Sequence, residues 1–81
     1  MTKGEALLEK ARNNLRGLRF AELIRLARHY NWLEDRQEGS HHILVNEKFA
    51  GIMDFQEDRN GKAKFYQVKQ LLDWIDEHTE D

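Results

Sequence analysis

The period of the apolar pattern changes at residues 32–46, which read WLEDRQEGSHHILVN. Trp32–Arg36 and His41–Asn46 are short segments rich in aromatic and β-branched residues, a composition typical of strands. The residues between them contain Gly39, and a spacer of this length with a glycine is typical of a β-hairpin. We therefore predict two antiparallel strands joined by a connection at residues 37–40.

A third strand is predicted over Phe49–Gln56, after a break at residues 47–48. Gly51 lies inside this segment and favours a bulge or a close approach of another part of the chain. The turn that follows, Asp58–Gly61, contains an Asn-Gly pair, which readily supplies a residue with positive φ. The centre of the chain is thus predicted to form a three-stranded antiparallel sheet.

Helices are predicted on both sides of these strands. Apolar residues at the helical spacing i, i+3, i+4 and i+7 indicate one helix over residues 19–30 and another over residues 66–78. These residues are Phe20, Leu23, Ile24 and Ala27 in the first helix and Val68, Leu71, Leu72 and Ile75 in the second. We expect an α+β domain of element order α-β-β-β-α, in which the two helices cover one face of the sheet.

An additional helix is predicted over residues 3–15. Thr2 and Glu5 have the spacing of a capping box, and apolar residues follow at helical intervals. We therefore divide the chain into an N-terminal helical extension, residues 1–17, and a domain, residues 18–81. The extension either packs on the domain or serves as an arm that docks a partner or a second copy.

The composition describes one small domain rather than several, with 81 residues of which 40% are hydrophobic and 35% charged. The absence of cysteine excludes a disulfide scaffold, a cysteine zinc site and a cysteine nucleophile, and it fits a reducing compartment. Apolar stretches are too short to span a bilayer, and no secretory signal follows the first lysine. We expect a cytoplasmic protein with no membrane partner.

The net charge of −2 is unlike that of a strongly basic nucleic-acid-binding protein, and the charges are unevenly distributed. Lys62, Lys64 and Lys69 fall in a stretch, residues 62–72, that holds no acidic residue, whereas acids dominate residues 73–81. These lysines are either a solvated helix start or a local surface for an anion. General affinity for polyanions should be weak and sensitive to salt.

The segment Gly39-Ser40-His41-His42 carries the clearest chemical signal. A glycine in a turn lets a ligand approach the backbone closely, and an imidazole beside it can take a proton from a ribose 2′-hydroxyl and return one to a leaving oxygen. Adjacent residues of a strand point to opposite faces, so one of the two histidines should belong to the ordinary surface or core. The same parity opposes chelation of one ion by both, and we predict no metal site and no cofactor.

Residues 20–24 (FAELI) and 36–42 (RQEGSHH) resemble the HicA toxin family, which is also called YcfA-like. The likeness continues through residues 61–64 (GKAK) and 66–68 (YQV) into the last predicted helix, and it covers about residues 18–78. It implies a fold like the double-stranded-RNA-binding domain. It also implies the toxin of a type II toxin–antitoxin system, an mRNA endoribonuclease that needs no metal and is held inactive by a HicB antitoxin.

The family's catalytic histidine directly follows Gly-Ser, and the resemblance therefore implies that role for His41. Asp54 or Glu57 could orient its ring as a carboxylate partner. In a domain of this kind the first hairpin turn and the start of the last helix lie toward RNA, where they read shape, 2′-hydroxyls and phosphates. The expected RNA-binding residues are Arg36, Gly39, Ser40, Lys62, Lys64 and Lys69.

The expected partners are mRNA and a HicB-like antitoxin, with no contact to DNA. Two other functions stay open. The first is a non-catalytic RNA-binding module on the same fold, which would use the lysines without His41. The second is a protein-interaction domain, which the acidic end and the additional helix favour. The aromatic side chains that could stack on bases, or form core instead, are Trp32, Phe65, Tyr66 and Trp74.

Overall fold

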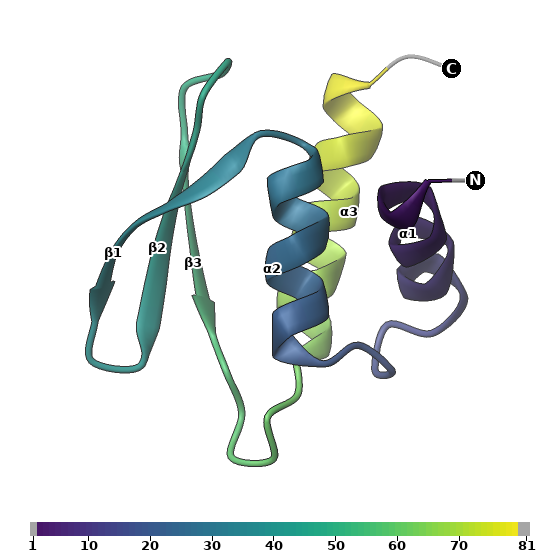
Figure 1. Ribbon diagram of the computed structural model, residues 1–81, viewed down its shortest axis with the longest axis horizontal. Helices are drawn as coiled ribbons and strands as arrows, with labels where there is room; N and C mark the ends of the chain where they lie inside the picture. Colours follow the sequence, from purple (N-terminus) through teal and green to yellow (C-terminus); the bar gives the residue numbers. More distant parts are fainter. Residues whose placement is uncertain (1, 80–81) are drawn as a thin grey trace.

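The chain folds in the order helix, helix, three strands, helix, which confirms the predicted α+β class (Figure 1). The computed structural model describes residues 2–79. The elements are α1 (Lys3–Asn13), α2 (Phe20–His29), β1 (Trp32–Glu38), β2 (His41–Asn46), β3 (Ile52–Gln56) and α3 (Phe65–His78). The predicted helix bounds differ from these by at most two residues, a usual uncertainty at frayed helix ends. Within residues 2–79 no helix is long and apolar enough to cross a membrane.

The elements are arranged in three layers (Figure 1). The strands are antiparallel and lie side by side in chain order, so β1 and β3 are the two edges of the sheet. Helices α2 and α3 cover one face of the sheet, and α1 lies on the far side of these helices. The other face of the sheet is uncovered, as the exposed side chains of Leu33 and Ile52 indicate.

The core lies between the sheet and the two covering helices. Trp32, Leu44 and Phe55 are fully buried and come from β1, β2 and β3, respectively. The helices meet them with the apolar stripes that the helical spacing predicts, which removes this apolar surface from water. The buried apolar residues are Phe20, Leu23, Leu26 and Ala27 in α2 and Val68, Leu71, Leu72 and Ile75 in α3.

The N-terminal extension packs on the rest of the molecule. The predicted capping box is present, with the Thr2 hydroxyl accepting the Glu5 N–H at 3.1 Å. Leu7 and Ala11 of α1 are buried in the same core cluster as the residues of α2 and α3. Gly4 brings the α1 backbone so close to the His29 ring of α2 that an added Cβ would lie 2.2 Å from it.

Ion pairs at the surface also join α1 to the other two helices. Lys10 of α1 pairs with Glu22 of α2 at 2.8 Å, and Arg12 of α1 pairs with Asp76 of α3 at 2.6 Å. Arg12 and Asp76 are exposed, so their pair contributes little stability. We conclude that apolar burial, with the close packing at Gly4, contributes more than the exposed Arg12–Asp76 pair to holding α1 in place.

The hairpin between β1 and β2 is tighter than predicted. β1 continues to Glu38, and Glu38 pairs with His41, which leaves a two-residue loop, Gly39-Ser40, where we predicted four residues. Gly39 has φ of 62°, as the first loop position of a type II′ turn requires. The strands therefore continue to the edge of the turn, and they hold His41 on regular, paired backbone.

The bulge in the sheet is in β1 rather than at Gly51. Register shifts between Glu34, which pairs with Leu44, and Arg36, which pairs with Ile43, so Asp35 is the extra residue. Gly51 precedes β3, and its φ of 136° turns the chain into that strand close to Trp32. The predicted start of the third strand at Phe49 is therefore wrong. Gly51 is favoured by its positive φ rather than by a bulge or a close approach, since an added Cβ would lie 3.7 Å from Trp32, an ordinary contact distance.

Candidate nucleic-acid interface and histidine pair

Neighbouring histidines in β2 point to opposite faces of the sheet, as strand parity predicts. His42 lies on the helix-covered face with Leu44, and its ring centroid is 4.8 Å from that of Phe20 in α2. The Nδ1 atom of His42 lies 2.6 Å from a carboxylate oxygen of Glu34. This ring is therefore packed into the fold, with its polar edge satisfied by Glu34.

His41 lies on the uncovered face, where its side chain is 50% exposed. Its Nδ1 atom is 3.0 Å from Oδ1 of Asp54 in β3. Because an ionised carboxylate can only accept, Nδ1 carries the hydrogen in this contact and Nε2 of the neutral ring keeps its lone pair. The sequence left Asp54 and Glu57 as alternatives for this role, and the structure brings Asp54 to the ring.

A second set of contacts joins the hairpin turn to the start of α3 through Gln56. The side-chain amide of Gln56 donates to the Ser40 hydroxyl at 2.6 Å, and its carbonyl oxygen accepts from the Lys64 ammonium at 2.8 Å. The backbone N–H of Gln56 donates to the side chain of buried Gln67 in α3. Ser40 and Lys64, both predicted to bind RNA, are thus brought to the same place as His41, which pairs with Gln56 in the sheet.

Gln56 is a residue that the sequence analysis missed as part of the site. No motif marks it, because its importance follows from the register that sets it opposite His41. Asp58 stabilises the neighbouring turn in a similar way. The backbone N–H groups of Lys62 and Asn60 donate to its carboxylate at 2.9 and 2.8 Å, which lowers the pKa of Asp58. This turn holds the segment that carries Lys62.

Arg36 is on the same face as His41 but is already engaged by carboxylates. Its guanidinium donates to Glu38 and to Asp35, the latter at 2.8 Å. The hydrogen bonds that Arg36 donates to Glu38 and then to Asp35 raise the pKa of Arg36 above its ordinary value. A phosphate would have to compete with these acids, so the structure does not present Arg36 as a free cation.

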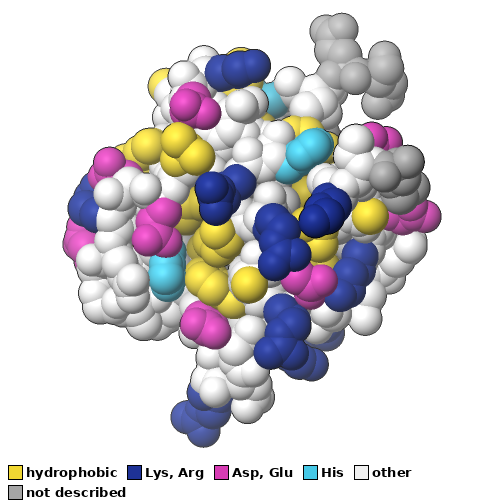
Figure 2. Space-filling model, in the orientation of Figure 1, with side chains coloured by type: hydrophobic (Ala, Val, Ile, Leu, Met, Phe, Trp, Pro, Cys, Tyr) yellow, Lys and Arg dark blue, Asp and Glu magenta, His cyan; other side chains and the backbone are white. Residues whose placement is uncertain are grey.

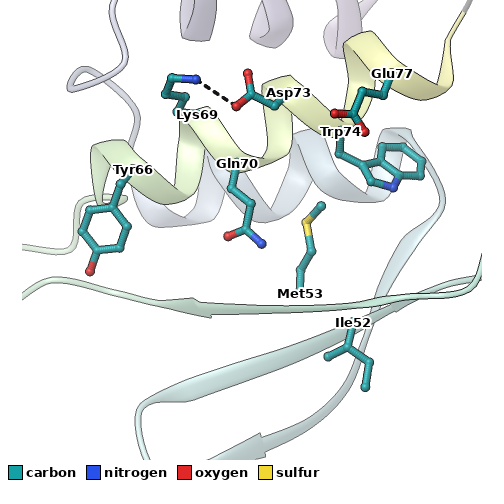
Figure 3. Close-up of a pocket in the computed structure, with 8 residues that line it drawn as sticks. All are labelled: Ile52, Met53, Tyr66, Lys69, Gln70, Asp73, Trp74 and Glu77. Atoms are coloured by element: carbon teal, nitrogen blue, oxygen red, sulfur yellow. Dashed lines mark hydrogen bonds and ion pairs between the residues drawn. The ribbon is translucent and has the colours of Figure 1, made fainter.

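Lys69 lies apart from the other two predicted lysines, farther along α3. Its ammonium pairs with Asp73 at 2.8 Å, as Figure 3 shows, whereas Gln70 points from the helix toward β3. A groove of about 470 Å³ between α3 and β3 is lined by these residues together with Ile52, Met53, Tyr66, Trp74 and Glu77. Lys69 thus belongs to this groove rather than to the turn at Ser40.

The aromatic residues divide between the core and the surface. Trp32 is buried and packs edge-to-face on half-buried Trp74. Phe65 and Tyr66 are 40% and 55% exposed at the start of α3. His78 stacks on Trp74 and its Nδ1 lies 2.9 Å from the Trp74 carbonyl oxygen. Among residues 2–79, the pair at the start of α3 is thus the uncovered aromatic surface near Lys62 and Lys64.

Charge is distributed differently over the helices and the strands. Figure 2 shows Lys and Arg side chains gathered over the helices, and acidic side chains intermixed with basic ones over the strands at the left. The acids beside His41 are Asp54, with which it forms a hydrogen bond, and Glu38, with which it is paired in the sheet.

No protein-family model, no curated protein and no solved structure matches this chain.

Proposed function

We propose that this protein is a HicA-like toxin of a type II toxin–antitoxin system, a metal-independent endoribonuclease that cleaves mRNA in the cytoplasm. The observation that supports it is the exposed His41–Asp54 pair beside the turn that Ser40, Gln56 and Lys64 hold together. An oriented imidazole next to a hydroxyl and an ammonium group is suited to proton transfer at an RNA phosphodiester.

In the proposed reaction His41 first acts as a base. Its Nε2 takes the proton of a ribose 2′-hydroxyl, and the 2′-oxygen attacks the adjacent phosphorus. The bond from phosphorus to the 5′-oxygen then breaks, and that oxygen receives a proton from the imidazolium. The products are a 2′,3′-cyclic phosphate and a 5′-hydroxyl, so no water, metal or oxidant is consumed. Asp54 keeps Nδ1 protonated and stabilises the imidazolium that forms.

Ser40 and Lys64 are proposed to contact the phosphate. The Ser40 hydroxyl accepts from Gln56 and therefore has its own hydrogen free to donate toward a phosphate oxygen. The Lys64 ammonium uses one of its three hydrogens on Gln56 and retains two for an anion. Gly39 contributes an open backbone at the turn, since nothing lies within 4 Å of the position of an added Cβ.

The paired histidines supply a matched test. His41→Ala should lower the rate of RNA cleavage in the presence of a chelator by roughly 10²–10⁴-fold and relieve growth arrest on expression. His42→Ala should leave the cleavage rate close to that of the unchanged protein, although it loses the Phe20 and Glu34 contacts and some stability. Asp54→Asn should reduce cleavage while retaining RNA affinity.

Equal toxicity of the His41→Ala and unchanged proteins, at matched expression, would show that the mechanism is wrong. A non-catalytic RNA-binding module that uses the lysines without His41 is the second candidate. The carboxylates of Glu38 and Asp54 favour it, because they repel a phosphate from His41. Intact RNA shifted on a gel, with the shift insensitive to His41→Ala and weakened by Lys62→Ala with Lys64→Ala, would support that alternative.

A HicB-like antitoxin is the proposed protein partner. Purification of this protein and the antitoxin as one complex tests that proposal.

A further inference from the structure

A pocket of about 260 Å³ lies where the α1–α2 connection meets the start of α3. It is separate from the groove between α3 and β3, although Tyr66 borders both. The lining residues are Arg16, Asp58, Lys62, Ala63, Lys64, Phe65 and Tyr66. Two neighbouring aromatic rings and three cations thus surround one small depression.

The two aromatic rings of this pocket, those of Phe65 and Tyr66, are partly exposed. Phe65 and Tyr66 are 40% and 55% exposed, and they meet each other edge-to-face with ring centroids 5.7 Å apart. The guanidinium of Arg16 lies over the Phe65 ring, 4.0 Å from its centroid. This contact orders Arg16 and covers part of Phe65. The Tyr66 ring lies at the N-terminal end of α3, as Figure 3 shows. A planar ligand can stack there.

The cations of the pocket are available to an anion. Neither Arg16 nor Lys62 forms an ion pair with another side chain in the described range 2–79, in contrast to Arg36 and Lys69. Asp58 is the one acid in the lining, and one of its oxygens already accepts two backbone N–H groups. Its other oxygen can accept from an N–H of a base.

Lys64 connects this pocket to the histidine. It lines the pocket and also donates to Gln56, which in turn donates to Ser40, the residue before His41. A strand of RNA that follows these polar groups from His41 therefore reaches the aromatic rings. An unpaired base can place its face on a ring, whereas a base inside a duplex has both faces covered by its neighbours.

We infer that Tyr66 and Arg16 form a subsite for an unpaired nucleotide, in which the base stacks on Tyr66 and its phosphates contact Arg16 and Lys62. This inference rests on the proposed RNA-cleaving function and adds that the substrate is single-stranded beside the bond that is cut. The double-stranded-RNA-binding type of fold would thus be used on single-stranded RNA.

Binding to a labelled single-stranded RNA oligonucleotide and to its fully paired duplex tests the subsite, with His41→Ala in every protein to prevent cleavage. Adding Tyr66→Ala should weaken single-strand binding about tenfold or more and leave duplex binding unchanged. Tyr66→Phe should retain the affinity, because it retains the ring. Phe49→Ala is the matched control, since Phe49 is 44% exposed and packs on Trp74 and His78 near the other end of α3.

An oligonucleotide series with one abasic position at a time locates the base. One abasic position should weaken binding as much as Tyr66→Ala does, and the two changes together should weaken it no further. If the proteins with and without Tyr66→Ala, both carrying His41→Ala, bind the single-stranded RNA with equal affinity, the subsite is overturned. If RNA is still cut in a His41-dependent manner, the proposed function survives that result, whereas the absence of any RNA binding overturns both.

Discussion

His41 and His42 each meet a carboxylate through Nδ1, and the sheet separates what the two rings can do. His42 is 19% exposed and rests on Phe20, so its Glu34 contact serves the fold. His41 is half exposed, and its Nδ1 atom meets Asp54. The same chemical pair is thus structural on one face and accessible on the other.

Asp58→Ala should lower stability at neutral pH, and the loss should shrink in acid. The pKa of Asp58 is lowered from 3.8 by backbone N–H donors of Lys62 and Asn60. Since the folded pKa lies below the unfolded one, the unfolded chain takes up the proton first as pH falls. The stabilisation is therefore present above about pH 4 and is lost as pH falls through the folded pKa.

Urea unfolding of the Asp58→Ala and unchanged proteins at several pH values between 7 and about 2.5 measures this difference. Asp58→Asn is the control, because it keeps an acceptor oxygen for the two N–H groups without the charge. A stability gap between Asp58→Ala and the unchanged protein that stays constant across this range would show that the carboxylate does not stabilise the turn.

For single residues, the sequence predicts which side chains lie at the hairpin turn but not which side chains form hydrogen bonds with them. Ser40 and His41 could be predicted as neighbours at a hairpin because Gly39 marks the loop. Gln56 could not, because its contact with Ser40 depends on the exact register between β2 and β3. The engagement of Arg36 by Glu38 could not be predicted either, since it requires both side chains on one face.

Among the elements, α1 is the one whose position depends on a single glycine. Gly4→Ala should destabilise the protein, because the new Cβ meets the His29 ring at 2.2 Å. The rearrangement needed to relieve such a clash typically costs about 1–3 kcal/mol of stability. This exceeds the ~1 kcal/mol by which alanine stabilises a helix relative to glycine. Thermal unfolding of Gly4→Ala measures the balance.

The same substitution in a His29→Ala background provides the control. Without the imidazole the added methyl group has room, so Gly4→Ala should there raise the free energy of unfolding by up to ~1 kcal/mol. The change in sign between the two backgrounds is the expected coupling. Stabilisation by Gly4→Ala in both backgrounds would mean that α1 does not pack on His29 as described.

The types of the elements could be predicted from periodicity, whereas the register of the strands and the length of the hairpin loop could not. The apolar stripes of α2 and α3 are regular enough to place both helices within two residues. The hairpin loop was predicted too long, because polar residues 37 and 38 look like loop although they pair with His42 and His41. An edge strand with one uncovered face accepts polar side chains, and composition therefore does not reveal its end.

For the whole molecule, charge placement matters more than the net charge of −2. Several cations are held by acids, including Arg36 by Asp35 and Lys69 by Asp73. The cations near the start of α3, Lys62 and Lys64, form no ion pair with a described side chain. Lys64 donates a hydrogen bond to Gln56, which is neutral. RNA affinity should therefore depend on a few residues rather than on the overall charge.

Salt dependence of RNA binding tests this expectation. In a His41→Ala background, Lys62→Ala should weaken binding to single-stranded RNA and flatten the slope of log affinity against log salt by about 0.7. Arg36→Ala should change that slope little, because its guanidinium is shared by two carboxylates. A loss of slope with Arg36→Ala equal to that with Lys62→Ala would show that Arg36 releases its acids to bind phosphate.

Side chains along β1 alternate between the two faces of the sheet, and the extra residue Asp35 shifts this alternation by one position. Before it, Glu34 shares a face with His42; after it, Arg36 shares a face with His41. Regular pairing of Asp35 with Ile43 would instead turn the last three side chains of the strand, residues 36–38, to the opposite faces, whereas deleting Asp35 would keep Arg36 opposite Ile43. The single extra residue in β1 thus determines which charged side chains are displayed beside each histidine.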